Sequence, residues 1–248
     1  MPLKRLTSWI ERLNPRQLEA IRTSVGLILF AMTVVFARVW TAWPDVRILA
    51  QEQPPAPADI ARAEEVEGGA VDWKPVGLNN VSPQLQLAVI VSEDIEFFQH
   101  HGFSWAEIRA ALAEIPAGGR PRGASTITQQ LAKNLWLSPH RSLWRKAREA
   151  ALTVDLERFL SKRRILELYL NVVPFGPGVY GAEAAAQRYF GKSALFLTEE
   201  ESAMLAAGLT RPSVWNPSTD SPEYRERVAL VRRRMANAEF LWRLLLGI

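Results

Sequence analysis

An uncharged apolar stretch near the N-terminus constrains this chain more than any other feature. Residues 23–37 read TSVGLILFAMTVVFA and contain no charged side chain. Fifteen residues fall short of the roughly 20 that a helix needs to cross a bilayer, but residues 23–43 are enough if Arg38 extends its guanidinium to the head groups. Trp40 and Trp43 would then lie at the membrane interface. We therefore predict a transmembrane anchor over residues 23–43, with a buried core helix as the alternative.

The flanking residues orient the predicted anchor. Residues 1–22 form a basic segment with five Lys or Arg side chains against two Glu, and the positive-inside rule places such a segment in the cytoplasm. No small-residue cleavage site follows the stretch, so we expect an uncleaved single-pass anchor. Residues 44–72 are rich in proline and acidic side chains, which is typical of a linker. The main domain, residues 73–248, would then lie outside the cytoplasm.

The amino-acid composition excludes several classes of protein and of chemical site. The 248 residues are 48% hydrophobic and 23% charged, which excludes a wholly disordered chain. With no cysteine, a disulfide scaffold, a thiolate zinc site and a cysteine nucleophile are excluded. The net charge of +4 favours an anionic partner such as nucleic acid, a membrane surface or a phosphorylated substrate.

The main domain shows helical spacing and almost no strand alternation, so the predicted class is all-α. Ser82-Pro83 predicts a helix start, and apolar residues continue at helical spacing until Gly102. Ser or Thr residues at positions 104, 126, 142, 161 and 198 predict the starts of further helices. Residues 217–248 are expected to form a basic helical tail.

The first candidate site is the acidic segment around Glu93. On the predicted helix, Glu93 and Phe97 lie four residues apart and share a face. A carboxylate that is partly desolvated beside aromatic surface, with Asp94 nearby, can serve as a proton acceptor. From spacing alone, a solvated acidic face is the alternative.

The second candidate site is the segment Gly123–Asn134, GASTITQQLAKN. A glycine followed by hydroxyl side chains at a helix start offers backbone N–H groups that suit phosphate or sugar oxygens. Lys133 adds a positive charge about two turns later. An ordinary helix cap is the alternative.

A third cluster combines Arg145, Lys146 and Glu149. It is either a surface salt bridge between residues four apart or a basic cluster for an anion. In the second case Glu149 would adjust the charge of the basic cluster or hold a divalent ion. A fourth segment, Lys162–Asn171, reads from its periodicity as an amphipathic helix.

In this order, the segments resemble the family 51 glycosyltransferases that polymerise peptidoglycan. The matching motifs are EDxxFxxHxG (Glu93, Asp94, Phe97, His100, Gly102), GxSTITQQLxKN (Gly123–Asn134), RKxxE (Arg145, Lys146, Glu149), KxxILExYLN (Lys162–Asn171) and GxGxYGxxxAAxxYFGK (Gly176–Lys192). The family's last motif is only partly kept, since Glu226-Arg227 stands where two arginines are expected. The resemblance covers about residues 73–216.

The resemblance implies a lysozyme-like helical domain with a smaller, membrane-associated jaw lobe, located on the periplasmic side of a bacterial inner membrane. It implies an inverting polymerisation of lipid II into β-1,4-linked glycan strands with release of undecaprenyl pyrophosphate. The chain length predicts a monofunctional enzyme without transpeptidase activity. The expected partners are lipid II, the growing strand and the membrane. Cell-wall synthesis or division proteins are candidate protein partners. No nucleic acid is expected, because no reading module is present.

The resemblance also assigns site residues. Glu93 is expected to be the general base and Glu149 a second essential glutamate. The expected substrate-binding residues are Asp94, Phe97, His100, Gly123, Ser125, Gln129, Gln130, Lys133, Asn134, Arg141, Arg145 and Lys146. No cofactor is required, and Mg²⁺ or Mn²⁺ held through Glu149 is the ion considered. The rivals are a lysozyme-like lytic enzyme that acts on finished glycan and a non-catalytic membrane scaffold.

Overall fold

The chain forms two compact units in the computed structural model, Met1–Asp45 and Val46–Ile248. The structure describes residues 14–41, 43–58, 60, 71–105, 109, 125–140 and 142–246. Most of the predicted helix after position 104 lies outside these residues, as do the site residues Gly123 and Arg141.

The first unit contains one long helix, α2 (Pro15–Thr41). Asn14 and Gln17 cap its start reciprocally, because each side-chain oxygen accepts the other residue's backbone N–H. The segment Pro15–Val34 has a mean hydropathy of 1.3 and none of it is buried, so it is long and apolar enough to span a membrane. The helix begins eight residues before the predicted anchor at residue 23.

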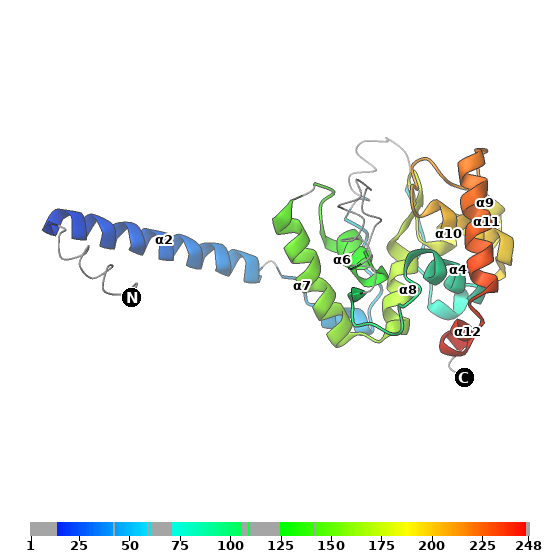
Figure 1. Ribbon diagram of the computed structural model, residues 1–248, viewed down its shortest axis with the longest axis horizontal. Helices are drawn as coiled ribbons and strands as arrows, with labels where there is room; N and C mark the ends of the chain where they lie inside the picture. The colour runs from blue at the N-terminus through cyan, green and yellow to red at the C-terminus, as the bar shows by residue number, and fades with distance from the viewer. Residues whose placement is uncertain are drawn as a thin grey trace. The chain divides into compact units, whose positions relative to one another are not determined.

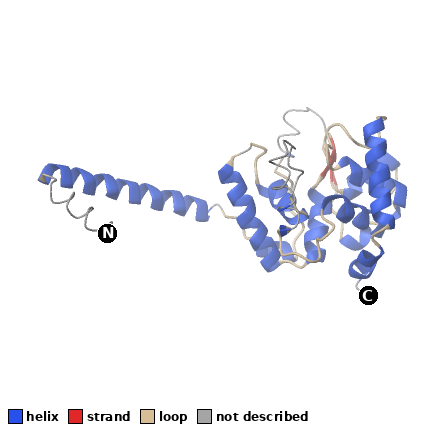
Figure 2. Ribbon diagram, in the orientation of Figure 1, coloured by secondary structure: helices blue, strands red, loops and turns tan. Residues whose placement is uncertain are grey.

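The second unit is mostly helical, as the sequence predicted (Figures 1 and 2). Its α-helices are α4 (Pro83–Glu93), α6 (Ile127–Trp136), α7 (Leu143–Phe159), α8 (Lys162–Val172), α9 (Ala182–Phe190), α10 (Glu199–Gly208), α11 (Pro222–Ala236) and α12 (Glu239–Leu246). Three short 3₁₀ helices are also present: η1 (Val46–Ala50), η2 (Leu78–Asn80) and η3 (Ala194–Phe196).

The predicted helix starts are confirmed at Ser82, Thr126, Ser142, Ser161 and Thr198. The side chain of each of these N-cap residues accepts a backbone N–H from the first turn of its helix. Thr126 and Thr198 form full capping boxes with the residue three positions later.

The sequence predicted the wrong end for the first helix of the main domain. α4 stops at Glu93 rather than continuing to Gly102, and Asp94 leaves the helical region with φ −163° and ψ 75°. The Asp94 carboxylate accepts the backbone N–H of Ile127 at the start of α6 (Oδ2–N 3.0 Å). Because this tertiary bond takes the chain out of the helix, Glu93 and Phe97 do not share a helix face.

A small sheet was not predicted. Its strands are β1 (Asp72–Trp73), β2 (Pro174–Gly176) and β3 (Val179–Tyr180), in the order β1-β3-β2. β1 pairs in parallel with β3, and β2 pairs with β3 in antiparallel fashion with a register shift. Strands of two or three residues are too short to show the alternation by which a sequence predicts them.

The core is built around α4. Its residues from Leu85 to Val91 are all buried, which identifies it as a central helix rather than a surface one. α4 packs against α10, α11 and α12, while α6 packs against α7 and α8 (Figure 1). α4 therefore delivers its last residue, Glu93, from the centre of the fold.

Two segments expected to lie outside the core pack into it. Val46 and Leu49 of η1, within the predicted linker, are buried, and η1 contacts α7. The C-terminal region is not a tail, because α11 buries Tyr224, Val231 and Met235 and packs on α4 and α10. The fold thus uses the C-terminal helices to cover one side of α4.

Candidate active site

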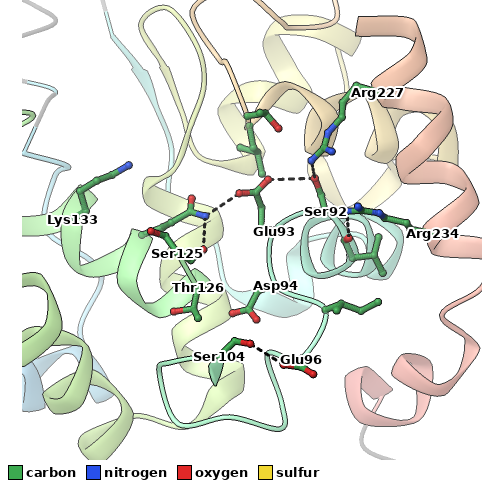
Figure 3. A pocket seen from close by; sticks show the side chains of 15 residues that line it. Ser92, Glu93, Asp94, Glu96, Ser104, Ser125, Thr126, Lys133, Arg227 and Arg234 are labelled. Atoms are coloured by element: carbon green, nitrogen blue, oxygen red, sulfur yellow. Dashed lines mark hydrogen bonds between the residues drawn. The ribbon is translucent and has the colours of Figure 1, made fainter. Parts of the chain in front are cut away.

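A cleft of about 760 Å³ opens where α4 ends. Its walls come from the end of α4, the loop that follows, the start of α6 and one face of α11. Glu93 lies in this cleft between Lys133 on one side and Arg227 and Arg234 on the other (Figure 3). A carboxylate therefore faces cationic side chains from two different helices.

The Glu93 carboxylate is held by neutral donors. Gln130 Nε2 donates to Oε2 at 2.9 Å. The Ser92 hydroxyl lies 3.3 Å from both Oε1 and the carbonyl oxygen of Ala206, and its single proton can serve one of them at a time. Arg227 Nη2 in turn donates to Ser92 Oγ at 3.2 Å. These bonds fix the direction of the carboxylate and leave its charge available to a proton in the cleft.

The two arginines of α11, Arg227 and Arg234, are functional candidates that were not among the predicted site residues, although Arg227 falls in the family's partly kept last motif. Arg234 Nη1 donates to the carbonyl oxygen of Val91 at 3.1 Å. Burial lowers the pKa of Arg227, the Glu93 charge acts to raise it, and the like charge of Arg234 lowers it further. Arg227 stays protonated, because the ordinary pKa of arginine is far above neutral. Their spacing of seven residues, two helical turns, was the available signal.

Asp94 and His100 hold the loop after α4. His100 Nδ1 accepts the backbone N–H of Gly102 (3.1 Å), so the ring proton is on Nε2 and faces Asp94 Oδ1 at 2.8 Å. Gly102 has φ +87°, and a Cβ there would come within 2.6 Å of Thr153 Cγ2. Only glycine fits this position without strain. Since Asp94 also bonds Ile127, the pair ties the loop to α6.

Phe97 belongs to the core beneath this loop. Its side chain is fully buried, and its ring packs edge-on against Phe98 at 5.1 Å. Lys162 Nζ lies 4.6 Å from the ring centroid. Phe97 therefore has no exposed surface for a ligand in this conformation.

The segment that begins at Ser125 is divided between site and scaffold. Ser125, Gln130 and Lys133 line the cleft with Glu93. Gln129 closes the capping box of α6, and the backbone carbonyl of Asn134 accepts the N–H of Ala58 (2.9 Å). The first group can reach a substrate in the cleft, and the second holds the helix that presents it.

The cluster on α7 is centred on Glu149, whose side chain is only 4% exposed. Arg145 Nη1 donates to Oε2 at 2.8 Å, and Lys146 Nζ donates to Oε1. None of the three is among the residues that line the cleft. Glu149 thus accepts hydrogen bonds from both cations of the cluster, and its role in ordering them stays a prediction.

A divalent ion at Glu149 fits this arrangement poorly. Both carboxylate oxygens already accept hydrogen bonds from cationic donors. Within the part of the chain that the structure describes, no three His, Asp or Glu side chains converge as a ligand set. The mechanism proposed below therefore uses no metal ion.

Comparisons with known proteins agree with this geometry. A family model described as Transglycosylase matches residues 62–236. Relatives named biosynthetic peptidoglycan transglycosylase include one from Rhodospirillum centenum, 40% identical over 89% of this chain and 90% of the relative. The relative from Alcanivorax borkumensis is 43% identical over 85% of each chain. That from Aeromonas hydrophila is 42% identical over 94% of this chain and 91% of its own.

The fold and the cleft define a helical enzyme in which one carboxylate faces fixed cations. The match covers most of the second unit, including α4, α6 and α11. The chain belongs to the transglycosylase family.

Proposed function

We propose that this protein polymerises lipid II into β-1,4-linked glycan strands and releases undecaprenyl pyrophosphate. The observation that carries the proposal is the position of Glu93 at the end of a buried helix, in a cleft with Lys133 and Arg227. The names of the relatives support a peptidoglycan substrate. A lytic enzyme would need the carboxylate but has no use for cations that bind pyrophosphate.

In the proposed reaction, Glu93 is the general base. It accepts the proton of the 4-hydroxyl of the acceptor N-acetylglucosamine as that oxygen bonds to C1 of the donor sugar. The bond from C1 to the pyrophosphate breaks on the opposite face, so the configuration inverts. The departing pyrophosphate takes the bonding electrons, and the fixed cations stabilise its growing charge.

Two arginines offer unused donors that suit such a substrate. Arg227 Nε and Arg145 Nε are buried and have no hydrogen-bond partner among the described residues. Buried donors without a partner are uncommon in folded proteins and fit an incoming oxygen. We assign Arg227 to the cleft beside Glu93 and Arg145, with Lys146, to a second anion-binding cluster ordered by Glu149.

The remaining site residues take the following proposed roles. Ser125, Gln130 and Lys133 contact sugar or phosphate from the cleft wall. Asp94 also lines the cleft and shapes it through its bonds to His100 and Ile127. The other predicted site residues are proposed to support the site or to bind substrate. They are Phe97, which supports it from the core, and His100, Gly123, Gln129, Asn134 and Arg141.

We also propose that α2 anchors the protein in the inner membrane with the second unit in the periplasm. α2 supplies an apolar span and follows a basic segment. α7 exposes Leu143 (92%), Trp144 (60%) and Val154 (53%), an apolar surface suited to the membrane interface. An anchored protein stays in the membrane pellet after alkaline carbonate washing, and protease digests its second unit in spheroplasts. Release by carbonate contradicts the anchor.

Purified lipid II tests the reaction. Wild type should make long glycan strands, and Glu93→Gln should make none while retaining its helical circular dichroism. Glu96→Gln is the matched control, because Glu96 lines the same cleft and bonds Ser104 rather than Gln130. Polymerisation by Glu93→Gln at the wild-type rate overturns the proposal. Intact lipid II together with trimmed sacculi would instead identify a lytic enzyme.

A further inference from the structure

A chain of two hydrogen bonds runs from α8 through a side chain of α6 to Glu93. The Tyr169 hydroxyl on α8 donates to Gln130 Oε1 at 3.0 Å. Gln130 Nε2 on α6 then donates to Glu93 Oε2 at 2.9 Å. Tyr169 is fully buried and is not among the residues that line the cleft. It therefore reaches the carboxylate only through the amide of Gln130.

The direction of this chain is fixed by its two ends. Burial raises the pKa of Tyr169 well above its ordinary value, and the charges of Glu93 and Asp94 raise it further. Tyr169 thus keeps its proton and remains a donor. The nitrogen end of Gln130 faces two acceptors, the Glu93 carboxylate and the carbonyl oxygen of Ser125 (3.4 Å).

The reverse orientation of the amide is unfavourable at both ends. Turning the Gln130 side chain by 180° would place Oε1 against the Glu93 carboxylate, so that two acceptors face each other. It would also remove the bond to the carbonyl of Ser125. The Tyr169 hydroxyl favours the observed orientation, because it supplies the proton that Oε1 accepts.

We propose that Tyr169 is a positioning residue for Glu93, and that it acts by orienting the side-chain amide of Gln130. The inference rests on the proposed role of Glu93 as the base. A carboxylate that must meet a hydroxyl proton needs a fixed direction, and errors of about 1 Å cost up to ~100-fold in rate. Gln130 supplies this direction without placing a positive charge on the base.

Tyr169→Phe tests the inference, since it removes one oxygen and keeps the ring. The full-length protein is assayed with purified lipid II over a range of pH. We expect kcat to fall roughly 10-fold, with KM unchanged, because the substrate contacts remain while the base loses its direction. We also expect the acidic limb of the kcat profile to move to higher pH. Without Tyr169 the amide of Gln130 is held less firmly, so its donation to Glu93 is weaker, and a carboxylate with a weaker donated hydrogen bond takes up a proton more readily.

Tyr224→Phe is the matched control. Tyr224 is also buried, and its hydroxyl donates to the carbonyl oxygen of Met204 at 2.9 Å, away from Glu93. Both variants lose a buried hydroxyl and one hydrogen bond, so thermal unfolding should shift similarly. Only Tyr169→Phe should change kcat and the pH profile. If the two variants have equal kcat, Tyr169 is structural and the inference is overturned.

Gln130→Met tests the link itself and does not require Tyr169→Phe to fold. Methionine has a similar size but cannot donate to Glu93, so kcat should fall at least as far as in Tyr169→Phe and the acidic limb should move in the same direction. A change in KM would report the loss of the substrate contact proposed for Gln130. Adding Tyr169→Phe to Gln130→Met should cause no further loss, since the pathway is already broken. Additive losses in the double variant, or a wild-type profile for Gln130→Met, overturn the inference. Activity in Glu93→Gln would instead overturn the proposed function.

Discussion

Gln129 and Gln130 are adjacent on α6, yet their side-chain amides bind different partners. Gln129 Oε1 accepts the backbone N–H of Thr126 at 3.0 Å and closes the capping box. Gln130 Nε2 donates to Glu93. Neighbouring residues on a helix point about 100° apart, so one amide starts the helix and the other reaches the cleft.

Gln129→Ala should act mainly on stability. It removes one half of the capping box, and we expect the free energy of unfolding to fall by about 0.5–1 kcal/mol. Urea titration followed by circular dichroism measures the change. The loss of kcat should be much smaller than for Gln130→Met. A large loss of kcat at unchanged stability would show that Gln129 contacts the substrate directly.

Arg227→Ala should reduce kcat/KM for lipid II by about 10-fold or more, because a fixed cation beside the reacting groups is lost. Arg225 on the same helix provides the control. Its side chain is 66% exposed and pairs with Asp220 at 2.7 Å. Arg225→Ala should stay within about twofold of wild type, since exposed pairs contribute little. Equal effects of the two substitutions on kcat/KM would show that Arg227 does not act on the substrate.

Glu149→Gln should weaken both folding and activity. The buried carboxylate accepts from Arg145 and Lys146, and an amide would turn its N–H₂ toward one of these cations. We expect a loss of about 1–3 kcal/mol in unfolding free energy. Strand synthesis should fall at least tenfold, because the two cations lose their fixed positions. Wild-type synthesis at 25 °C, where the variant remains folded, would show that this cluster is not needed.

Glu183 should make stability depend on acid pH. Burial acts to raise its pKa, but hydrogen bonds from Ala194 N, Gln187 and Ser193 and the charge of Lys74 bring it below the ordinary 4.5. A lowered pKa in the folded state stabilises the fold at pH above the unfolded value. That contribution disappears as the pH falls through the folded value.

Glu183→Gln is the variant that measures this effect. Wild type should be the more stable protein at pH 7, and the difference should shrink as the pH falls from about 5 towards 3. Urea unfolding at several pH values gives the comparison. A difference that is constant over this range would show that the carboxylate's ionisation does not contribute.

The sequence predicted the starts of helices better than their ends. A cap such as Thr126 bonds a backbone N–H only three residues away, so the pattern that creates it lies within one short segment. The end of α4 depends on Asp94 and the N–H of Ile127, which are 33 residues apart. The spacing of apolar residues around Glu93 does not depend on that hydrogen bond, so it predicted a helix that was too long.

The residues of the site also divide into those that short motifs predicted and those that long-range contacts bring in. The motif residues Glu93, Gln130 and Lys133 were predicted from the sequence, and the structure brings them to one cleft. Arg227 was interpreted as part of a basic tail, because its link to Ser92 spans 135 residues. Tyr169 was interpreted as part of an amphipathic helix, although its hydroxyl bonds Gln130 across 39 residues.

The order of residues by itself determined the helical class, the long apolar helix at the N-terminus and the presence of acidic and basic motifs. Each depends on spacings of a few residues, over which backbone geometry fixes what a side chain can reach. Only the tertiary structure decided that α11 completes the cleft and that the Tyr169 hydroxyl donates to Gln130. Those contacts join helices that pack because their apolar faces are buried, and burial carries no information about which polar groups will meet.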